Sequence, residues 1–468
     1  MNILWLTLDH VTFRHYRLNK KAKPILPTYE RLGRQGVTFD HCKSAHPLCM
    51  PARASMLTGV YTHKHGIFRN GPDMWLATEY APAASVLKDA GYRLGYFGKN
   101  HSGMDLAAVG FEGYFPASYG NPYMTQEYKD YLKRKGLPDP IFHHEGGMSE
   151  KFEVGKDYNL VETNYFNHPN WGYFKEKGPF HEIDFLLDMA GDWLRERASE
   201  NAPFVLRLDA WGPHQAYQIP LDYKDTIINA EDIEPYPGYD EDALPYKPAF
   251  AGNFLEWQRG RAGKGGKKCW KEWQLPLKRA YEHYSYIDMR LGSLLDDLER
   301  LGLAENTAVI FTADHGDAIA SHGGMFDKCG DLAEELMDIP MVVSAPGLPK
   351  GVVNSSFVSN LDVVPTVLDL LGVKKPYEMD GISLKQVALG NLERDRLMCE
   401  HYGHHGVFYD QRVIYRGVWK YVETKDEMDQ LYNLEADPYE LRNEADSCPQ
   451  VLAEMKKELA ELKEVYTD

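Results

Sequence analysis

Polar side chains that could do chemistry follow directly after four apolar, β-rich runs of the sequence. In an open α/β sheet, ligands bind beyond the carboxyl ends of the strands, so these side chains are expected to meet at one edge. A single Asp after a strand is more often a turn former or a helix cap, but four coincident strand ends weaken that alternative. The four segments are Asp9-His10, Gly98-Lys99-Asn100-His101, Trp211-Gly212-Pro213-His214 and Asp314-His315-Gly316-Asp317.

Asp9, Asp314 and His315 would offer oxygen and imidazole donors to a divalent cation. Calcium prefers an all-oxygen shell, whereas imidazole favours manganese, zinc or iron, so the residues leave the identity of the metal open. For His10, packing or orienting a ligand is at least as plausible as direct ligation. Asp317 is expected to support the site or cap a helix rather than to bind the metal.

The segment from Cys49 to Gly59, with the sequence CMPARASMLTG, is the sharpest chemical signal. Pro51 suits the first turn of a helix and Gly59 can end it, so Cys49 is predicted at a helix N-terminus. Unpaired amides and Arg53, one turn further on, favour negative charge at that point. Judged on these residues alone, an ordinary low-pKa thiol and a buried structural cysteine both remain open.

Strands alternating with helical patterns must position these groups, and that alternation predicts a mostly parallel sheet with helices on both faces. Apolar residues from Tyr284 to Leu298 recur at three- and four-residue steps and predict one stripe that faces the sheet. The expected strands are Ile3 to Leu8, Arg93 to Phe97, Phe204 to Leu208, Ala308 to Thr312 and Met341 to Ser344. The expected helices are Ala84 to Ala90, Ile183 to Ala198, Ala280 to Leu301 and Val363 to Leu371.

Two stretches with weak periodicity, Asn121 to Gly178 and Pro220 to Leu275, are predicted as long surface excursions that shape the substrate mouth. The second contains the basic run from Lys264 to Lys268, which is interpreted as a solvated loop. After Gly372 the pattern changes to short strands and a terminal helix. We therefore predict a catalytic α/β domain over residues 1–375 and a smaller α+β domain with an antiparallel sheet over residues 376–468.

Composition excludes several classes of function. Lys and Arg number 52 against 69 Asp and Glu, a net charge of −17 that disfavours nucleic acid and anionic membrane surfaces as partners. No stretch approaches the ~20 apolar residues that a membrane span needs. The first residues lack the cationic segment of a secretory signal, and the six cysteines are scattered, so a cytoplasmic protein with reduced thiols is expected.

The Cys49 to Arg53 segment, followed by Leu57-Thr58-Gly59, resembles the Cys-x-Pro-(Ser/Ala)-Arg signature of the type I sulfatases of the alkaline phosphatase superfamily. The resemblance implies that family's α/β fold and the hydrolysis of sugar, aryl or alkyl sulfate esters. It covers most of the chain, because four segments match in order: Ser44 to Gly66, Gly91 to His101, Tyr284 to Lys328 and Leu431 to Pro438.

The same resemblance implies that Cys49 is oxidised to formylglycine by a separate maturation enzyme. The hydrated aldehyde would attack sulfur, and its second hydroxyl would allow sulfate to leave. The implied metal ligands are Asp9, Asp314, His315 and an oxygen of modified Cys49. Calcium is expected from the family, with manganese or zinc as alternatives.

Other roles are carried over residue by residue. Arg53 would stabilise the modified side chain, Lys99 and Lys328 would hold the sulfate oxygens, and His101 would contact the hydrated aldehyde. His214 would serve the leaving group as a general acid or hydrogen-bond donor. Many family members have a second Asp where this chain has His10, which removes a carboxylate and puts calcium in doubt.

Two alternatives stay open. The same formylglycine would serve a phosphonate monoester or phosphodiester hydrolase, although the Lys99 to His101 segment looks like the sulfatase version of that strand end. If Cys49 stays a thiol, the protein would bind sulfated ligands without hydrolysing them. The expected substrate is a small carbohydrate, aryl or alkyl sulfate, and the His401 to His405 cluster is expected to line a pocket or a surface loop.

Overall fold

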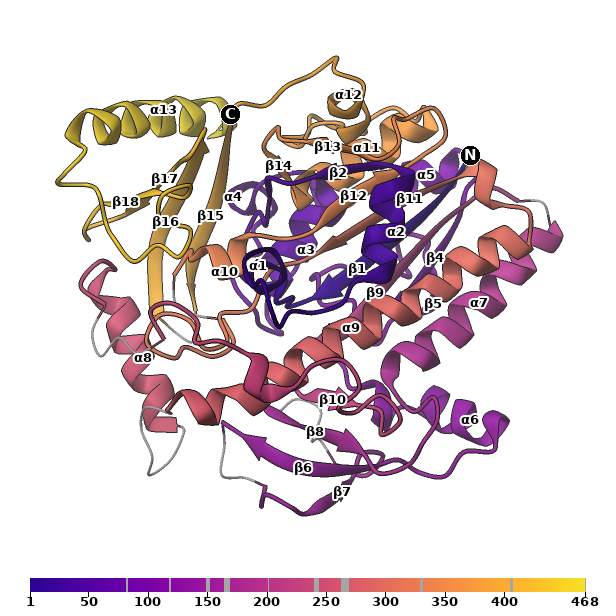
Figure 1. Cartoon of the computed structure of the whole chain (residues 1–468). Coiled ribbons are helices and arrows are strands. Elements are labelled where there is room, and N and C mark those ends of the chain that lie inside the picture. Colours follow the sequence, from indigo (N-terminus) through magenta and orange to yellow (C-terminus); the bar gives the residue numbers. More distant parts are fainter. Residues whose placement is uncertain are drawn as a thin grey trace.

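A computed structural model describes residues 1–80, 83–117, 119–148, 152–163, 169–200, 202–239, 244–261, 269–328, 331–404 and 407–467. The basic run from Lys264 to Lys268, Cys329 and His405 lie outside these residues. Figure 1 shows a central sheet flanked by helices, a small sheet below it and a terminal sheet beside it. In the described part of the chain, no helix combines the length and apolarity that crossing a bilayer demands.

An eight-stranded sheet forms the core, in the order β13-β2-β12-β11-β1-β9-β4-β5. Within it β12 pairs antiparallel with both of its neighbours, and the other pairs are parallel, which confirms the predicted mostly parallel sheet. The strands are β1 (Asn2–Asp9), β2 (Val37–Phe39), β4 (Arg93–Gly98), β5 (Glu112–Tyr114), β9 (Phe204–Pro213), β11 (Thr307–Ala313), β12 (Met341–Ser344) and β13 (Val352–Asn354). Continuous apolar runs make β1, β9 and β11 buried on both faces.

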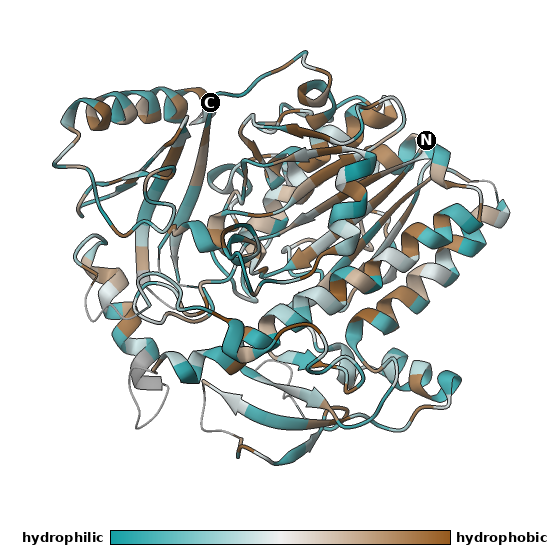
Figure 2. Cartoon of the chain, viewed as in Figure 1, coloured by the Kyte–Doolittle hydropathy of each residue, from teal (hydrophilic) through white to brown (hydrophobic). Residues whose placement is uncertain are grey.

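Helices cover both faces of this sheet (Figure 1). One layer comprises α2 (Pro27–Gln35), α7 (Glu182–Glu200) and α9 (Trp270–Arg300), and the other comprises α3 (Cys49–Thr58), α5 (Ala83–Asp89) and α11 (Val363–Leu371). The predicted stripe of α9 is buried from Tyr284 to Leu298. Apolar residues gather in the central strands and on the inner sides of these helices (Figure 2). The helix begins at Trp270, ten residues before the expected start, and it contains Pro276.

The stretch from Asn121 to Gly178 is more ordered than the predicted surface excursion. It forms most of a second, four-stranded sheet of order β10-β8-β6-β7, preceded by α6 (Gln126–Lys135). Its strands are β6 (Ile141–Gly147), β7 (Asp157–Asn159), β8 (Asn170–Phe174) and β10 (Tyr217–Ile219). Side chains of β6 alternate between buried and half-buried positions, as expected for a sheet with one covered face. In the stretch from Pro220 to Leu275, α8 (Ala249–Arg261) and the start of α9 replace part of the expected loop.

The C-terminal part forms an antiparallel sheet of order β15-β16-β17-β18, packed under a terminal helix (Figure 1). Its elements are β15 (Arg396–His404), β16 (Val407–Arg416), β17 (Trp419–Thr424), β18 (Gln430–Asn433) and α13 (Pro449–Thr467). Buried Met398, Ile414 and Leu431 of the sheet pack with Leu459 of the helix. The predicted antiparallel sheet is therefore present, and the division of the chain at residue 375 stays a prediction.

Shorter elements connect these layers. They are α1 (Phe13–Leu18), α4 (Thr62–His65), α10 (Glu334–Met337), α12 (Leu384–Ala388) and the paired strands β3 (Cys42–Lys43) and β14 (Val358–Ser359).

Candidate active site

Cys49 is the first residue of α3, and only 1% of its surface is exposed. The helix ends at Gly59, whose backbone has φ 71°, a left-handed conformation that glycine adopts without strain. The start and the end of the helix therefore lie where the motif predicts them.

Three buried groups, Asp9, Asp314 and His315, converge on Cys49. One donor atom each from Asp9, Cys49, Asp314 and His315 lies within 4.8 Å of every other. His315 Nε2 is 3.1 Å from Cys49 Sγ, and Asp9 Oδ1 is 3.9 Å from the same sulfur. The structure thus brings together the four residues that the sequence assigns to a metal.

The donor chemistry of this cluster fits a divalent cation. His315 Nδ1 lies 2.8 Å from the carbonyl oxygen of Gly316, which accepts its proton and leaves the Nε2 lone pair directed at Cys49. Burial and the nearby Asp9 raise the pKa of Asp314, as expected for two carboxylates that share a small space. Two carboxylate groups and an imidazole so arranged could bind calcium, manganese or zinc.

Arg53 lies beneath this cluster with its guanidinium fully buried. Its Nε donates to Asp314 Oδ2 at 2.9 Å, and its Nη1 donates to Asp209 Oδ2 at 2.7 Å. Nη2 is 3.5 Å from Asp9 Oδ2 and has no hydrogen-bond partner among the described atoms. Arg53 therefore fixes two of the carboxylates and leaves one N–H group directed at the site.

Lys99 and Lys328 both place positive charge close to Cys49. Lys99 forms a buried ion pair with Asp9 and lies 4.0 Å from the centre of the Tyr119 ring. Burial alone would raise the pKa of the Cys49 thiol, but Lys328 and Lys99 lower that pKa to about 6. The surroundings of residue 49 thus favour negative charge on its side chain.

His214 and Lys328 form a pair at the rim of the cluster. Lys328 Nζ lies 3.0 Å from His214 Nε2 and 2.8 Å from Asp327 Oδ1. His214 Nδ1 lies 2.6 Å from the carbonyl oxygen of Gln215, so Nδ1 carries the ring proton and Nε2 accepts from Lys328. Burial and the charge of Lys328 hold the pKa of His214 well below its ordinary value.

His101 and His10 complete the set of imidazoles. His101 is buried beside Tyr119, with ring centroids 5.5 Å apart, and burial and the charge of Lys99 lower its pKa. His10 lies outside the four-residue cluster, with Nε2 3.3 Å from Asp317 Oδ1 and its ring 4.6 Å from that of His214. One donor atom each from His10, His214 and Asp327 lies within 4.8 Å of the others, so both roles that the sequence gave His10, orientation and ligation, stay predictions.

Asp317 and His401 form hydrogen bonds with other side chains of the fold. Asp317 accepts a hydrogen bond from Tyr217 and caps no helix, because it lies in the loop after β11. His401 belongs to β15, where its Nδ1 lies 2.9 Å from Gln411 Oε1.

Two residues of the site were missed by sequence reasoning. Asp209 lies inside β9 and carries no motif, yet it receives hydrogen bonds from Arg53, Arg207 and Tyr96. Asn70 lies in a loop 21 residues after Cys49; its Oδ1 accepts from the backbone N–H of Met50 at 2.9 Å, and its Nδ2 is 4.0 Å from Cys49 Sγ. For Asp209, the only signal in the sequence was a charged residue inside the apolar strand Phe204 to Pro213.

The chain is similar to known proteins along its whole length. A family model described as Sulfatase matches residues 1–373, and one described as N-sulphoglucosamine sulphohydrolase, C-terminal, matches residues 321–465. An ulvan-active sulfatase from Formosa agariphila is 25% identical over 477 residues, covering 98% of this chain and 81% of the relative.

Solved structures share the fold. A phosphonate monoester hydrolase from Agrobacterium radiobacter aligns with a TM-score of 0.81 and 21% identity, covering 99% of this chain and 96% of the other. A protein solved in complex with its substrate D-glucosamine-2-N,6-O-disulfate aligns with a TM-score of 0.70 and 20% identity, covering 100% of this chain and 98% of the other.

Proposed function

The chain belongs to the sulfatase family and is a sulfuric ester hydrolase, and from that premise we propose that the residues around Cys49 perform the hydrolysis on the sulfate ester of a small sugar or aryl compound. One observation carries this proposal. Two buried lysines, a guanidinium and a cluster of metal-ligand type all converge on a single cysteine at a helix N-terminus.

Two groups complete the site in this proposal. Asp9, Asp314, His315 and residue 49 would hold a divalent cation, which lowers the pKa of an oxygen acid bound to it. Conversion of Cys49 to formylglycine by a maturation enzyme would supply an oxygen nucleophile. The calcium expected from the family and cytoplasmic action both stay predictions from the sequence.

The protein's own side chains then bind and orient the sulfate group. Lys99 and Lys328 lie close enough to lower the pKa of Cys49, and they would neutralise the non-bridging sulfate oxygens, which otherwise repel an anionic nucleophile. Arg53 is held by Asp314 and Asp209, so its free Nη2 would donate to residue 49 without reorganisation. Asn70 would fix the side chain of residue 49 from the opposite side through its own bond to the backbone of Met50.

The leaving group requires a proton, and His214 with Lys328 would provide it. Lys328 Nζ donates toward His214 Nε2, and its positive charge disfavours protonation of that imidazole. When a sulfate oxygen pairs with the Lys328 ammonium, that charge would be neutralised, and His214 Nε2 would take up a proton from water and donate it to the bridging oxygen. The Gln215 carbonyl keeps the other ring nitrogen protonated and so holds the tautomer.

The test combines mass measurement with turnover. Tryptic cleavage yields the peptide from Ser44 to Arg53, and conversion of Cys49 lowers its mass because oxygen replaces sulfur. We expect matured protein to carry the lighter peptide and to release sulfate from 4-nitrophenyl sulfate, and both properties to be lost in Cys49→Ala. Fully active protein with an intact thiol would contradict the role of the modification.

The remaining alternatives have separate readouts. Comparing kcat/KM for paired sulfate and phosphodiester substrates distinguishes a sulfatase from a phosphonate monoester or phosphodiester hydrolase. Activity that survives in Asp9→Ala but not in Cys49→Ala would contradict the metal. Binding without turnover would favour the non-hydrolysing alternative.

A further inference from the structure

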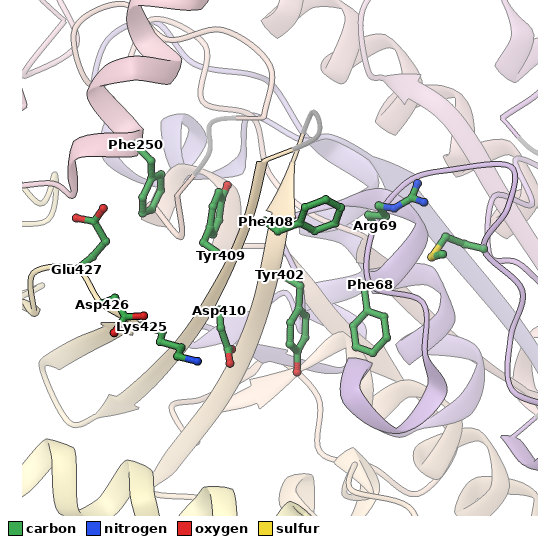
Figure 3. A pocket seen from close by; sticks show the side chains of 11 residues that line it. Phe68, Arg69, Phe250, Tyr402, Phe408, Tyr409, Asp410, Lys425, Asp426 and Glu427 are labelled. Atoms are coloured by element: carbon green, nitrogen blue, oxygen red, sulfur yellow. The ribbon is translucent and has the colours of Figure 1, made fainter.

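A cavity of about 880 Å³ opens between the loop after α4, the helix α8 and the C-terminal sheet (Figure 3). Phe68, Arg69 and Met74 form one wall, next to Asn70, whose amide is 4.0 Å from Cys49 Sγ. Tyr402 lies on the strand whose Glu400 N–H donates to the carbonyl of Ala45, four residues before Cys49. Both walls are therefore attached to the turn that leads into α3.

Aromatic rings dominate the lining of this cavity. Phe250 and Tyr409 stack with centroids 4.3 Å apart, and Phe68 meets Tyr402 edge to face at 4.9 Å. Figure 3 shows Phe408 between these two pairs. Its side chain is 75% exposed, an unusual position for a phenylalanine, and its ring face is available to a ligand.

The charges of the cavity are mixed, with a slight excess of acid. Asp410, Asp426 and Glu427 line it together with Arg69 and Lys425, and Figure 3 shows Lys425 beside Asp426 and Arg69 on the other side. Arg69 is already paired with Asp73 at 2.5 Å, and Asp410 is paired with Arg412. Among the described residues of the lining, basic side chains are therefore not in the surplus that binding of a second sulfate group would require.

We propose that this cavity binds the leaving group of the substrate, and that this group is an uncharged ring, of a sugar or an aryl compound, carrying no anionic group besides the sulfate ester that is cleaved. The proposal rests on the proposed function for the position of the ester, and adds the class of compound attached to it. Phe408 and the Phe68–Tyr402 pair would stack on the ring, and Asp426 and Glu427 would repel further sulfates.

Phe408→Ala tests the stacking. The residue is largely exposed, so the variant should fold normally, and Val353→Ala, an exposed apolar residue on β13 outside the cavity lining, is the matched control. We expect KM for 4-nitrophenyl sulfate and N-acetylglucosamine 6-sulfate to rise about fivefold, with kcat within about twofold, and KM for ethyl sulfate to stay unchanged. An equal effect on all three substrates, or none, would overturn the proposal.

The acidic residues are tested by a charge comparison. We expect wild-type kcat/KM for N-acetylglucosamine 6-sulfate to exceed that for glucosamine-2-N,6-O-disulfate by about tenfold, and the Asp426→Asn, Glu427→Gln double variant to reduce this ratio to about threefold. Equal use of both sugars by the wild-type protein would contradict the exclusion of a second sulfate.

Binding measurements separate this proposal from the proposed function. In a Cys49→Ala background, calorimetry with N-acetylglucosamine 6-sulfate requires no turnover. Affinity that falls about fivefold on adding Phe408→Ala supports the ring site even if wild-type protein hydrolyses no sulfate ester. Turnover of sulfate esters together with unchanged affinity would leave the function standing and overturn the ring site.

Discussion

Asp209 Oδ2 accepts a hydrogen bond from Arg53 Nη1 at 2.7 Å, and this contact joins the helix that carries Cys49 to the middle of the central sheet. The same carboxylate accepts hydrogen bonds from Arg207 Nε and Nη2, each at 2.7 Å. Arg207 also lies 3.9 Å from the centre of the Trp5 ring. One buried anion thus compensates two buried cations.

Asp209→Asn removes the carboxylate that pairs with Arg207 and one of the two carboxylates that accept hydrogen bonds from Arg53. Because a buried charge without its partner is costly, the free energy of unfolding should fall by about 3 to 5 kcal/mol. Urea unfolding of the purified variant measures the change. As a matched control, Asp296→Asn breaks an exposed pair with Arg31 and should cost under about 1 kcal/mol. Similar small losses in both variants would refute the structural role of Asp209.

Lys328→Ala should weaken both chemistry and sulfate binding, because this buried ammonium contacts His214 and lies beside Cys49. We expect kcat/KM for 4-nitrophenyl sulfate to fall about 10²- to 10³-fold and the inhibition constant of inorganic sulfate to rise. Steady-state kinetics gives both values. Lys375→Ala, at an exposed position, should change neither. An unchanged inhibition constant in Lys328→Ala would argue against contact with sulfate.

Removal of the metal should abolish activity. After dialysis against a chelator, we expect turnover to disappear and to return with one of calcium, manganese or zinc. Elemental analysis should find one ion per chain in active protein and less in Asp314→Asn, since this substitution removes a carboxylate from the cluster. Full activity in protein shown to be free of metal would contradict the assignment of Asp9, Asp314 and His315.

Asp288 on α9 should make stability depend on pH. Burial raises the pKa of this carboxyl from 3.8 to about 7, although backbone N–H groups of Thr28 and Tyr29 oppose the rise. A group whose pKa is raised in the folded state stabilises the fold below its unfolded pKa. That contribution is lost as pH rises from about 4 to about 7, and is worth up to about 4 kcal/mol.

Asp288→Asn should therefore flatten the loss of stability between about pH 4 and pH 7. Thermal unfolding at a series of pH values measures the slope, and the exposed Asp296→Asn on the same helix should keep the wild-type slope. Identical slopes in wild type and Asp288→Asn would show that another group is responsible.

Local sequence patterns predicted much of this fold for a physical reason. Strands such as β1 and β11 are continuous apolar runs, and the polar residue that ends each run must emerge at the sheet edge, so Asp9 and Asp314 could be placed together. Asp209 escaped because its partners Arg53 and Arg207 are visible only in three dimensions. The small sheet escaped because glycines interrupt the alternation in β6 and β8.

The cavity lined by Phe68, Phe250, Tyr402 and Phe408 could not be predicted from the sequence, for a related reason. Phe68, Phe250, Tyr402 and Phe408 come from three distant parts of the chain, and no local period connects them. The sequence associated the 401–405 histidines with a pocket or a surface loop, and Tyr402 between them does line the cavity.

The hydrogen bond between Glu400 and Ala45 has an evolutionary consequence. Because β15 is hydrogen-bonded to the turn that leads into α3, a shift of the terminal sheet would also move the turn before Cys49, so substitutions that displace this sheet would be selected against. Phe408, near the start of β16, takes no part in that hydrogen bond. Related proteins could therefore change the range of compounds they accept by substitution at Phe408, while the residues around Cys49 stay the same.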